Sequence, residues 1–200
     1  MLVRRGADER GAGVASRSDS GDDARLLGRI AEGDRRAFEA LYRAYHPRLS
    51  RFIGAMLRRP HLVEEVLNDT MLVVWRRPQG YNGKSKVSTW ILAIAYRRSL
   101  KALSRADDPV EDRDADGRPS PEASPEQQLA RSEVRAALRQ AMGELSAHHR
   151  AVVDLTYFHE AGYREIAEIM DCPVDTVKTR MFHARRHLKT KLAGQLTDWL

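Results

Sequence analysis

The stretch YREIAEIMDCPVDTVKTRMFHARRHL, residues 163–188, decides the fold of the C-terminal part of this chain. A short amphipathic segment places three apolar residues on one side, at Ile166, Ala167 and Met170. A tight turn follows, and its Pro173 suits the start of a helix, where the missing N–H is not needed. Apolar residues then recur in steps of three and four, at positions 174, 177, 181, 184 and 188. One continuous buried stripe on the second helix, after a compact turn, predicts a helix-turn-helix.

The opposite face of the second helix is polar and cationic. It collects Asp175, Thr179, Phe182, His183 and Arg186, with Lys178 on its flank. Such side chains contact base edges in the major groove, where an apolar group also meets a thymine methyl. An ordinary amphipathic helix with a solvated cationic face is the alternative interpretation. The compact turn, the single stripe and the aromatic Phe182 outside that stripe together favour DNA recognition.

Helical patterns continue upstream of this motif. One helix is expected over about 127–141, and Ser146 is expected to cap another that reaches Phe158. Further upstream, residues 22–105 show helical periodicity throughout. Asp34 is expected to cap the second helix of that region, Pro47 to kink it without ending it, and Ser88 to cap the fourth. Trp75 and Trp90 continue apolar stripes and are expected in the core.

Residues 106–126 differ in composition from the segments on either side. They read ADDPVEDRDADGRPSPEASPE and hold eight acidic and two basic residues, a net charge of −6. The whole chain has a net charge of +6, so the remainder carries +12. We therefore predict an all-α fold of two small helical domains joined by a flexible acidic linker. The expected segments are a disordered tail (1–21), an N-terminal domain (22–105), the linker (106–126), a helix-turn-helix domain (127–192) and a C-terminal tail (193–200).

Composition excludes several classes of protein. Cys172 is the single cysteine, so an internal disulfide framework and a cysteine-rich metal site are excluded, which fits the cytoplasm. No apolar run reaches the roughly 18 residues of a membrane span, and no signal peptide is visible. His148 and His149 are adjacent and do not share a helix face. With no glycine-rich phosphate loop and no catalytic or metal-binding constellation, we expect no enzyme activity, no metal and no cofactor.

Three motifs resemble one protein family. The stretch YREIAEIMDCPVDTVKTRMFHARRHLK is similar to the C-terminal helix-turn-helix of bacterial extracytoplasmic-function (ECF) sigma factors. VEEVLNDTMLVVWRR, residues 63–77, resembles the polymerase-binding helix of that family. STWILAIAYRRSLKAL, residues 88–103, resembles the helix that follows its promoter-melting loop. The resemblance spans roughly residues 22–192, with the two modules in the family's order.

The resemblance implies a function in transcription initiation. Such proteins bind core RNA polymerase, recognise and help to open the −10 element through the N-terminal module, and read the −35 element through the helix-turn-helix. The positions that match polymerase contacts are Glu64, Glu65, Asn68 and Asp69. A solvated acidic face is the alternative interpretation of these four residues.

The resemblance also assigns DNA contacts. The positions expected to read the −35 element are Lys178, Thr179, Phe182, His183 and Arg186. Phosphate contacts are expected at Thr176, Arg180, Arg185 and Lys189. The loop 78–88 matches the segment that captures an unstacked −10 base, and a plain connector is its alternative interpretation. Stacking, base-edge and phosphate contacts there and on the following helix are expected from Tyr81, Asn82, Lys84, Lys86, Arg97, Arg98 and Lys101.

The chain departs from the family's pattern at several positions. The common pattern has Arg, Asn and a later Asp where Tyr96, Arg97 and Lys101 stand, so base assignments on this helix do not transfer. Asp175 replaces a usual Gly or Ser, and its carboxylate would repel phosphate or accept a bond from a cytosine amino group.

The resemblance leaves other readings open. In the family the linker threads toward the polymerase active site, and a soluble tether is the equally weighted alternative here. An anti-sigma factor is an implied partner. The main alternative function is a helix-turn-helix transcriptional regulator that binds DNA without being a polymerase subunit; an RNA-binding or structural helical protein is a second. Target promoters, regulon and inducing signal are not readable from the sequence.

Overall fold

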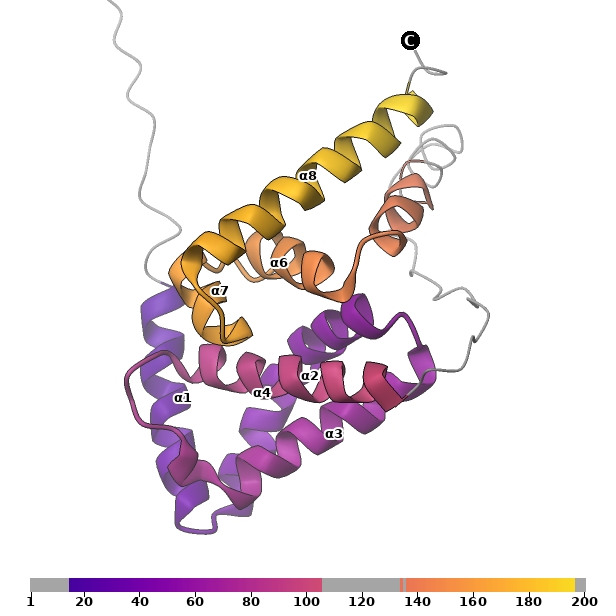
Figure 1. The fold of residues 1–200 in the computed structure, drawn as a ribbon. Helices are drawn as coiled ribbons and strands as arrows, with labels where there is room; N and C mark the ends of the chain where they lie inside the picture. Colours follow the sequence, from indigo (N-terminus) through magenta and orange to yellow (C-terminus); the bar gives the residue numbers. More distant parts are fainter. Residues whose placement is uncertain (1–14, 106–133, 135, 197–200) are drawn as a thin grey trace, which may run out of the picture.

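The computed structural model describes residues 15–105, 134 and 136–196 (Figure 1). These residues form helices and contain no strand, which confirms the all-α prediction. The predicted acidic linker, residues 106–126, lies outside the described residues, as do most of the N-terminal tail and the last residues of the chain.

The N-terminal half consists of four α-helices and one 3₁₀ turn. They are α1 (Ala15–Ala31), α2 (Arg35–Leu57), α3 (Pro60–Arg76), η1 (Pro78–Gly80) and α4 (Val87–Arg105). Helix α1 begins seven residues before the Asp22 expected from the sequence, so 15–21 belong to a helix rather than to the predicted tail. This segment reads ASRSDSG, with three serines, and has no apolar period. Helix formation is cooperative, which allows the apolar turns that follow to extend the helix into it.

Local signals account for the limits of α2. The Asp34 side chain accepts hydrogen bonds from the backbone N–H groups of Arg36 and Ala37, as the predicted N-cap requires. A hydrogen bond from the Arg29 side chain holds the pKa of Asp34 below its usual value. Pro47 lies inside the helix without ending it, and the chain leaves α2 through Arg58 in the left-handed conformation.

The core of this half is formed where α2, α3 and α4 meet. Its fully buried side chains include Leu41, Phe52, Leu67, Met71 and Ile91. Trp75 and Trp90 pack against this core with part of each ring exposed, as the apolar periodicity predicted. The N-terminal half therefore forms a helical support for the loop between η1 and α4.

The C-terminal half consists of a helix over 136–143, then α6 (Ala147–Tyr157), α7 (Tyr163–Met170) and α8 (Val174–Leu196). Ser146 caps α6 by accepting the backbone N–H of His149, as predicted. Helix α8 continues to Leu196, about one turn beyond the expected end near Leu192.

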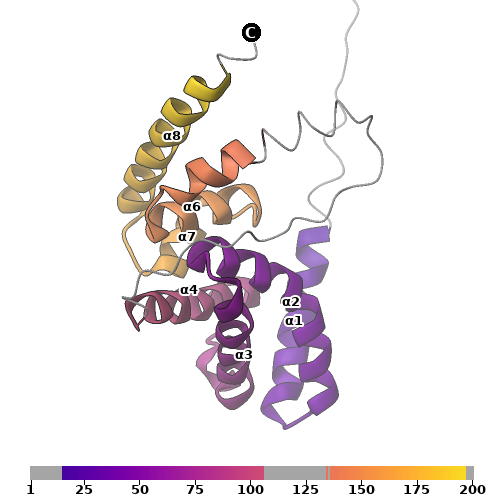
Figure 2. The same ribbon diagram turned by 90° about the vertical axis from the view of Figure 1, so that its right-hand side faces the viewer.

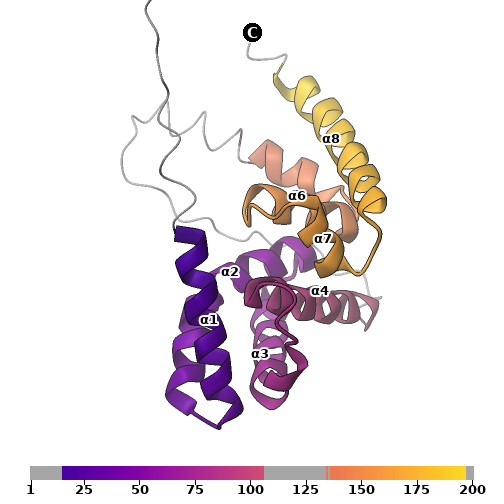
Figure 3. The same cartoon turned by 90° about the vertical axis from the view of Figure 1, so that its left-hand side faces the viewer.

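The two halves pack directly against each other. Helix α7 lies on α4, and α6 lies along α2 (Figures 2 and 3). Buried residues of both halves join in one hydrophobic cluster. The sequence predicted two modules on a tether, and this packing between them was not anticipated.

Candidate nucleic-acid interface

The helix-turn-helix has the geometry that the sequence predicted. Asp171 ends α7 in the left-handed conformation, with φ of 49°, and the N–H of Cys172 bonds to the carbonyl of Ala167 at 3.1 Å. The inward stripe of α8 is buried at Val177, Met181 and Ala184. This packing fixes which face of α8 points outward.

The outward face of α8 presents the residues expected to read bases. Lys178, Thr179, Phe182, His183 and Arg186 are all exposed. Phe182 is 61% exposed, and within the described residues its ring contacts are with His183 and Arg186 of the same helix. A large aromatic left in solvent is typical of a surface that awaits a partner. Asp175 holds the neighbouring Lys178 ammonium at 2.9 Å, so the departure at this position bears directly on one predicted base contact.

The residues expected to contact phosphates are more dispersed. Lys189 is exposed, whereas Thr176 and Arg180 are only partly exposed. The Arg180 guanidinium turns inward, 3.6 Å from the sulfur of Cys172. Arg185 is exposed and lies 5.9 Å from the ring centre of Tyr157. The structure therefore places Arg180 and Arg185 against protein groups as well as at the surface.

Tyr81 supports the loop between η1 and α4 from within. Its ring centre lies 5.8 Å from that of Trp90, and its hydroxyl donates to the carbonyl of Ser85 at 2.6 Å. The sequence suggested Tyr81 as a stacking platform for a base, but in the structure the ring packs against protein. An isolated loop tyrosine gives no sign of such packing, because the partner ring lies nine residues away on the next helix.

The tip of this loop presents amide and ammonium groups. The Asn82 side-chain oxygen accepts the backbone N–H of Lys84 at 3.0 Å, and Gly83 has φ of 72° in the left-handed region that favours glycine. Asn82 and Lys84 are exposed. Lys84 is therefore held at the tip of a defined turn.

Lys86, at the end of the loop, contacts the C-terminal half. The carboxylate of Glu165 on α7 lies 3.3 Å from the Lys86 ammonium and accepts a 2.6 Å hydrogen bond from the buried hydroxyl of Thr89. Glu165 was not among the functional residues that the sequence predicted. An acidic residue in the first turn of a helix is explained by the helix dipole alone, so it gave no separate signal.

A second polar contact joins the halves further along α4. The Tyr96 hydroxyl and Nδ1 of His148 lie 2.6 Å apart. Burial raises the pKa of Tyr96 above its usual value, while burial and then the charge of Arg180 lower the pKa of His148. Neutral imidazole is therefore the favoured form of His148 at neutral pH.

The residues expected to contact the polymerase lie together on one face of α3. Glu64, Glu65, Asn68 and Asp69 are all exposed. The Tyr42 hydroxyl donates to the Asn68 side-chain oxygen at 3.0 Å, and Asp69 lies 3.5 Å from the guanidinium of Arg98 on α4. Arg97 and Lys101 are exposed on α4. The Asp69–Arg98 pair thus joins the expected polymerase face to the expected DNA face.

The described residues also bear on metal sites and membrane spans. No group of three or more His, Cys, Asp or Glu side chains in the described part of the chain could hold a metal ion. Among the described helices, none combines the length and the apolar character needed to cross a bilayer.

Comparisons with known proteins agree with the two-part organisation. The family model "Sigma-70 region 2" matches residues 41–108, and "Sigma-70, region 4" matches residues 135–188. The ECF RNA polymerase sigma factor SigK of Mycobacterium sp. (strain JLS) is 30% identical over 172 residues, covering 84% of this chain and 89% of that protein. The RNA polymerase sigma-H factor of Pseudomonas aeruginosa is 29% identical over 186 residues, covering 88% and 96%.

Two solved structures share the fold. CnrH, solved in complex with the cytosolic domain of CnrY, superposes with a TM-score of 0.63 at 21% identity, covering 86% of this chain and 98% of that one. The sigma factor RpoE, solved with the anti-sigma factor NepR from Bartonella quintana, gives 0.63 at 20% identity, covering 78% and 96%.

Proposed function

The chain belongs to the extracytoplasmic-function family of RNA polymerase sigma factors, and from this premise we propose how its surfaces divide the work of initiation. The face of α3 around Glu65 and Asn68 docks on core RNA polymerase. The loop 81–86 and the basic edge of α4 engage the −10 element and aid strand opening. The outward face of α8 reads the −35 element, in the cytoplasm and without catalysis by this chain.

The exposed Phe182 is the observation that supports the α8 assignment best. It stands at the centre of a cationic and hydroxyl-bearing face, opposite a stripe that is buried at Val177, Met181 and Ala184. Arg and Lys meet guanine acceptors in the major groove, and an aromatic ring meets a thymine methyl. A helix that served only to close the core would not need this aromatic outside its stripe.

The packing of the free chain implies that the halves separate when both elements are read. Elements named −10 and −35 lie about 25 base pairs apart, on the order of 85 Å at ~3.4 Å per base pair. Helix α4 has 19 residues and is therefore ~28 Å long. Since the −10 loop contacts α7 through Lys86 and Glu165, the chain cannot span both elements while its two halves are packed together. We infer that polymerase binding accompanies opening.

An anti-sigma factor is part of the proposal. Both solved structures named above contain a second protein, the cytosolic domain of CnrY in one and the anti-sigma factor NepR in the other. By analogy, this chain has a protein antagonist that competes with core polymerase.

Gel shift with and without core polymerase tests the function. We expect the free full-length chain to bind promoter DNA weakly, and the reconstituted holoenzyme to bind it and to give run-off transcripts. Strong specific DNA binding by the free chain, with no effect of core enzyme, would instead support the helix-turn-helix regulator.

A further inference from the structure

Two adjacent histidines in the first turn of α6 have different neighbours. Nδ1 of His148 lies 2.6 Å from the Tyr96 hydroxyl of α4. The ring centre of His149 instead lies 6.3 Å from that of His183 on α8, with the rings inclined at 43°. Adjacent positions on a helix project about 100° apart. One histidine therefore joins the two halves, whereas the other faces the helix-turn-helix.

The His149–His183 pair lies at the edge of the reading face of α8. His183 is exposed on that face, and His149 is partly exposed beside it. A helix with its side chains is about 10–12 Å across and nearly fills a major groove about 12 Å wide. Groups that flank the reading helix therefore face the phosphates that line the groove. When His183 reaches a base edge, His149 lies on the side of the DNA backbone.

The two imidazoles together have the donors that one phosphate oxygen needs. Nδ1 of His183 lies 3.5 Å from a guanidinium nitrogen of Arg186. A guanidinium can only donate, so a neutral His183 accepts at Nδ1 and carries its proton on Nε2. Protonated His149 supplies a second, charged donor. Charge-assisted N–H···O bonds are about 2.7–2.9 Å long, and one oxygen at that distance can bridge two rings with centres 6.3 Å apart.

The surroundings of His149 in the free chain disfavour its charged form. Burial, and then the charges of His183 and Arg180, lower the pKa of His149 below its ordinary value. His148 and His187 act in the same direction. All four groups whose charges act on this imidazole are basic. An anion beside the pair would therefore offset a repulsion that already exists.

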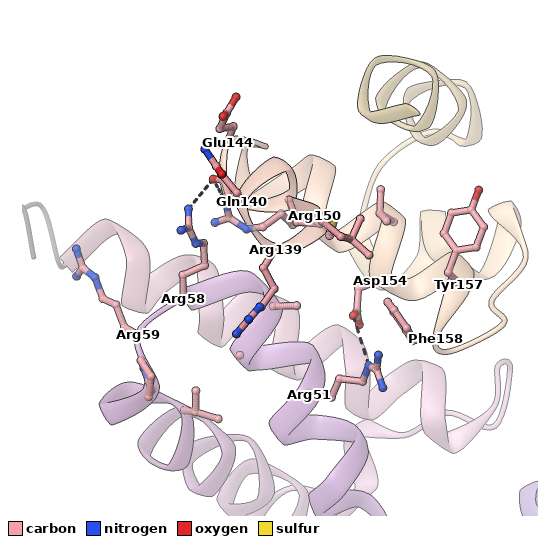
Figure 4. A pocket seen from close by; sticks show the side chains of 18 of the residues that line it. Arg51, Arg58, Arg59, Arg139, Gln140, Glu144, Arg150, Asp154, Tyr157 and Phe158 are labelled. Carbon is pink, nitrogen blue, oxygen red and sulfur yellow. Dashed lines mark hydrogen bonds and ion pairs between the residues drawn. The ribbon is translucent and has the colours of Figure 1, made fainter. Parts of the chain in front are cut away.

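The carboxylate of Glu144, close to these residues in the sequence, is directed to other cations. Glu144 lines a pocket between the two halves (Figure 4). Its carboxylate lies 2.7 Å from the Lys191 ammonium and 3.4 Å from Nε2 of His187. A negative charge next to His149 is thus what a bound phosphate would add.

We propose that His149 is a further DNA-contact residue, which together with His183 binds one backbone phosphate beside the −35 element and takes up a proton on binding. The proton comes from solvent and forms one N–H bond on the His149 imidazole. The inference rests on the proposed function and deepens it, because it adds a residue of α6 to the −35 site and couples that site to pH.

The sign of the coupling follows from the charges. The phosphate raises the pKa of His149 in the complex above its lowered value in the free chain, so the complex binds more protons than its separated components. Affinity for the −35 element therefore rises as pH falls through this interval. One proton taken up changes affinity by at most about tenfold per pH unit.

A metal ion is the other ligand that a pair of imidazoles suggests. Within the described residues, no group of three or more His, Cys, Asp or Glu side chains could hold one. The charge of Arg180, which acts on His149, opposes a bound cation as it opposes a proton. An anion suits these surroundings better.

Binding of preassembled holoenzyme to a promoter duplex at pH 7.5 and pH 6.0 tests the proposal. Over this interval we expect wild-type affinity to gain about threefold or more beyond the gain of His149→Gln. His149→Lys is charged at both pH values, so it should bind at least as tightly as wild type at pH 7.5 and lose this share of the pH response. His61→Gln, an exposed histidine of α3 outside the proposed DNA surfaces, is the matched control and should respond like wild type.

Neutral methylphosphonate linkages, placed one at a time along the −35 duplex, locate the phosphate. At one position the neutral linkage should remove the part of the pH response that depends on His149. The same linkage moved by half a helical turn, about five base pairs, should leave that part unchanged.

Four results would overturn the inference. They are equal pH responses of wild type and His149→Gln, weaker binding by His149→Lys than by His149→Gln at pH 7.5, no methylphosphonate position that alters the response, and a wild-type response that EDTA abolishes. The last result would assign the pair to a metal ion. Holoenzyme binding that ignores the −35 sequence at both pH values would instead count against the proposed function.

Discussion

The carboxylate of Glu165, in the first turn of α7, accepts a 2.6 Å hydrogen bond from the hydroxyl of Thr89, in the first turn of α4. Thr89 is 2% exposed, and the neighbouring Lys86 ammonium lies 3.3 Å from the same carboxylate. Lys86 is also a residue expected to contact promoter DNA. While the two halves are packed together, the Glu165 carboxylate therefore lies beside Lys86, where a promoter phosphate would be expected once DNA is bound.

Glu165→Ala tests the strength of this contact. The substitution removes the acceptor of a buried hydroxyl, so we expect the free energy of unfolding to fall by about 1–2 kcal/mol. Urea denaturation measures it. Glu168→Ala, an exposed change on the same helix, should alter stability by no more than ~0.5 kcal/mol. Equal effects of the two substitutions would contradict a specific role of Glu165.

Phe182→Ala and Lys178→Ala test the reading face of α8. Each should weaken −35-dependent promoter binding by the holoenzyme by ~1–3 kcal/mol, the scale of one lost base contact. Both side chains are exposed, so thermal stability should be nearly unchanged. Competition binding with matched and altered −35 sequences gives the measurement, and Thr190→Ala, further along the same helix, is the control. Wild-type discrimination in both variants would refute the assignment.

Arg150→Met tests the interface between the two halves. It leaves the Met56 and Leu145 carbonyls without the donors that they have now, and each lost partner of a buried group costs ~1–3 kcal/mol. We expect a loss of about 2–4 kcal/mol in the free energy of unfolding. Arg58→Met, at an exposed residue that donates to Gly143, should cost less. The prediction fails if Arg58→Met lowers the free energy of unfolding more than Arg150→Met does.

His148→Gln tests the pH dependence of the interface. Burial and Arg180 lower the pKa of His148 from its ordinary 6.5, so the unfolded chain takes up a proton at higher pH than the folded chain. Stability is therefore retained above about pH 6.5 and is lost as pH falls from there through the lowered folded pKa. The imidazole hydrogen-bonds with the Tyr96 hydroxyl and interacts with the charge of Arg180, and His148 and His149 also interact electrostatically.

Stability measured by urea denaturation from pH 7.5 to about pH 5.5 should fall more steeply for wild type than for His148→Gln. Thr190→Ala, an exposed change on α8 that removes no ionisable group, should keep the wild-type slope. If His148→Gln and the wild-type chain show the same pH profile, His148 does not titrate as described.

Tyr81→Phe tests the support of the −10 loop. The ring can still pack on Trp90, but the hydrogen bond to the Ser85 carbonyl is lost. The stability of the loop should therefore fall by about 0.5–1.5 kcal/mol. We expect slower promoter opening by the holoenzyme, measured by permanganate reactivity of the DNA, and unchanged binding in the closed complex. Tyr81→Ala should slow opening further. A Tyr81→Phe variant that opens at the wild-type rate, beside a slow Tyr81→Ala, would assign the role to the ring alone.

The candidate site was only partly predictable. The outward face of α8 follows from helical periodicity, because 3.6 residues per turn decide which side chains oppose a buried stripe. The loop 81–86 could be located, but the position of the Tyr81 ring could not, since it depends on the packing of Trp90. Arg180 likewise belongs to the predicted phosphate contacts by position, while its guanidinium lies beside Cys172.

The sequence by itself determined where most of the helices lie, the caps at Asp34 and Ser146, the helix-turn-helix and the family. The expected start of the first helix was wrong, and so was the expected cap at Ser88, which lies inside α4. Each of the confirmed features depends on residues within a few turns of one another, where propensity and periodicity act. The tertiary structure alone decided that Glu165 meets Thr89 and that Arg150 meets Met56, pairs separated by 76 and 94 positions in the chain. No local pattern encodes such contacts, because they form only when two amphipathic surfaces that are distant in the sequence pack against each other.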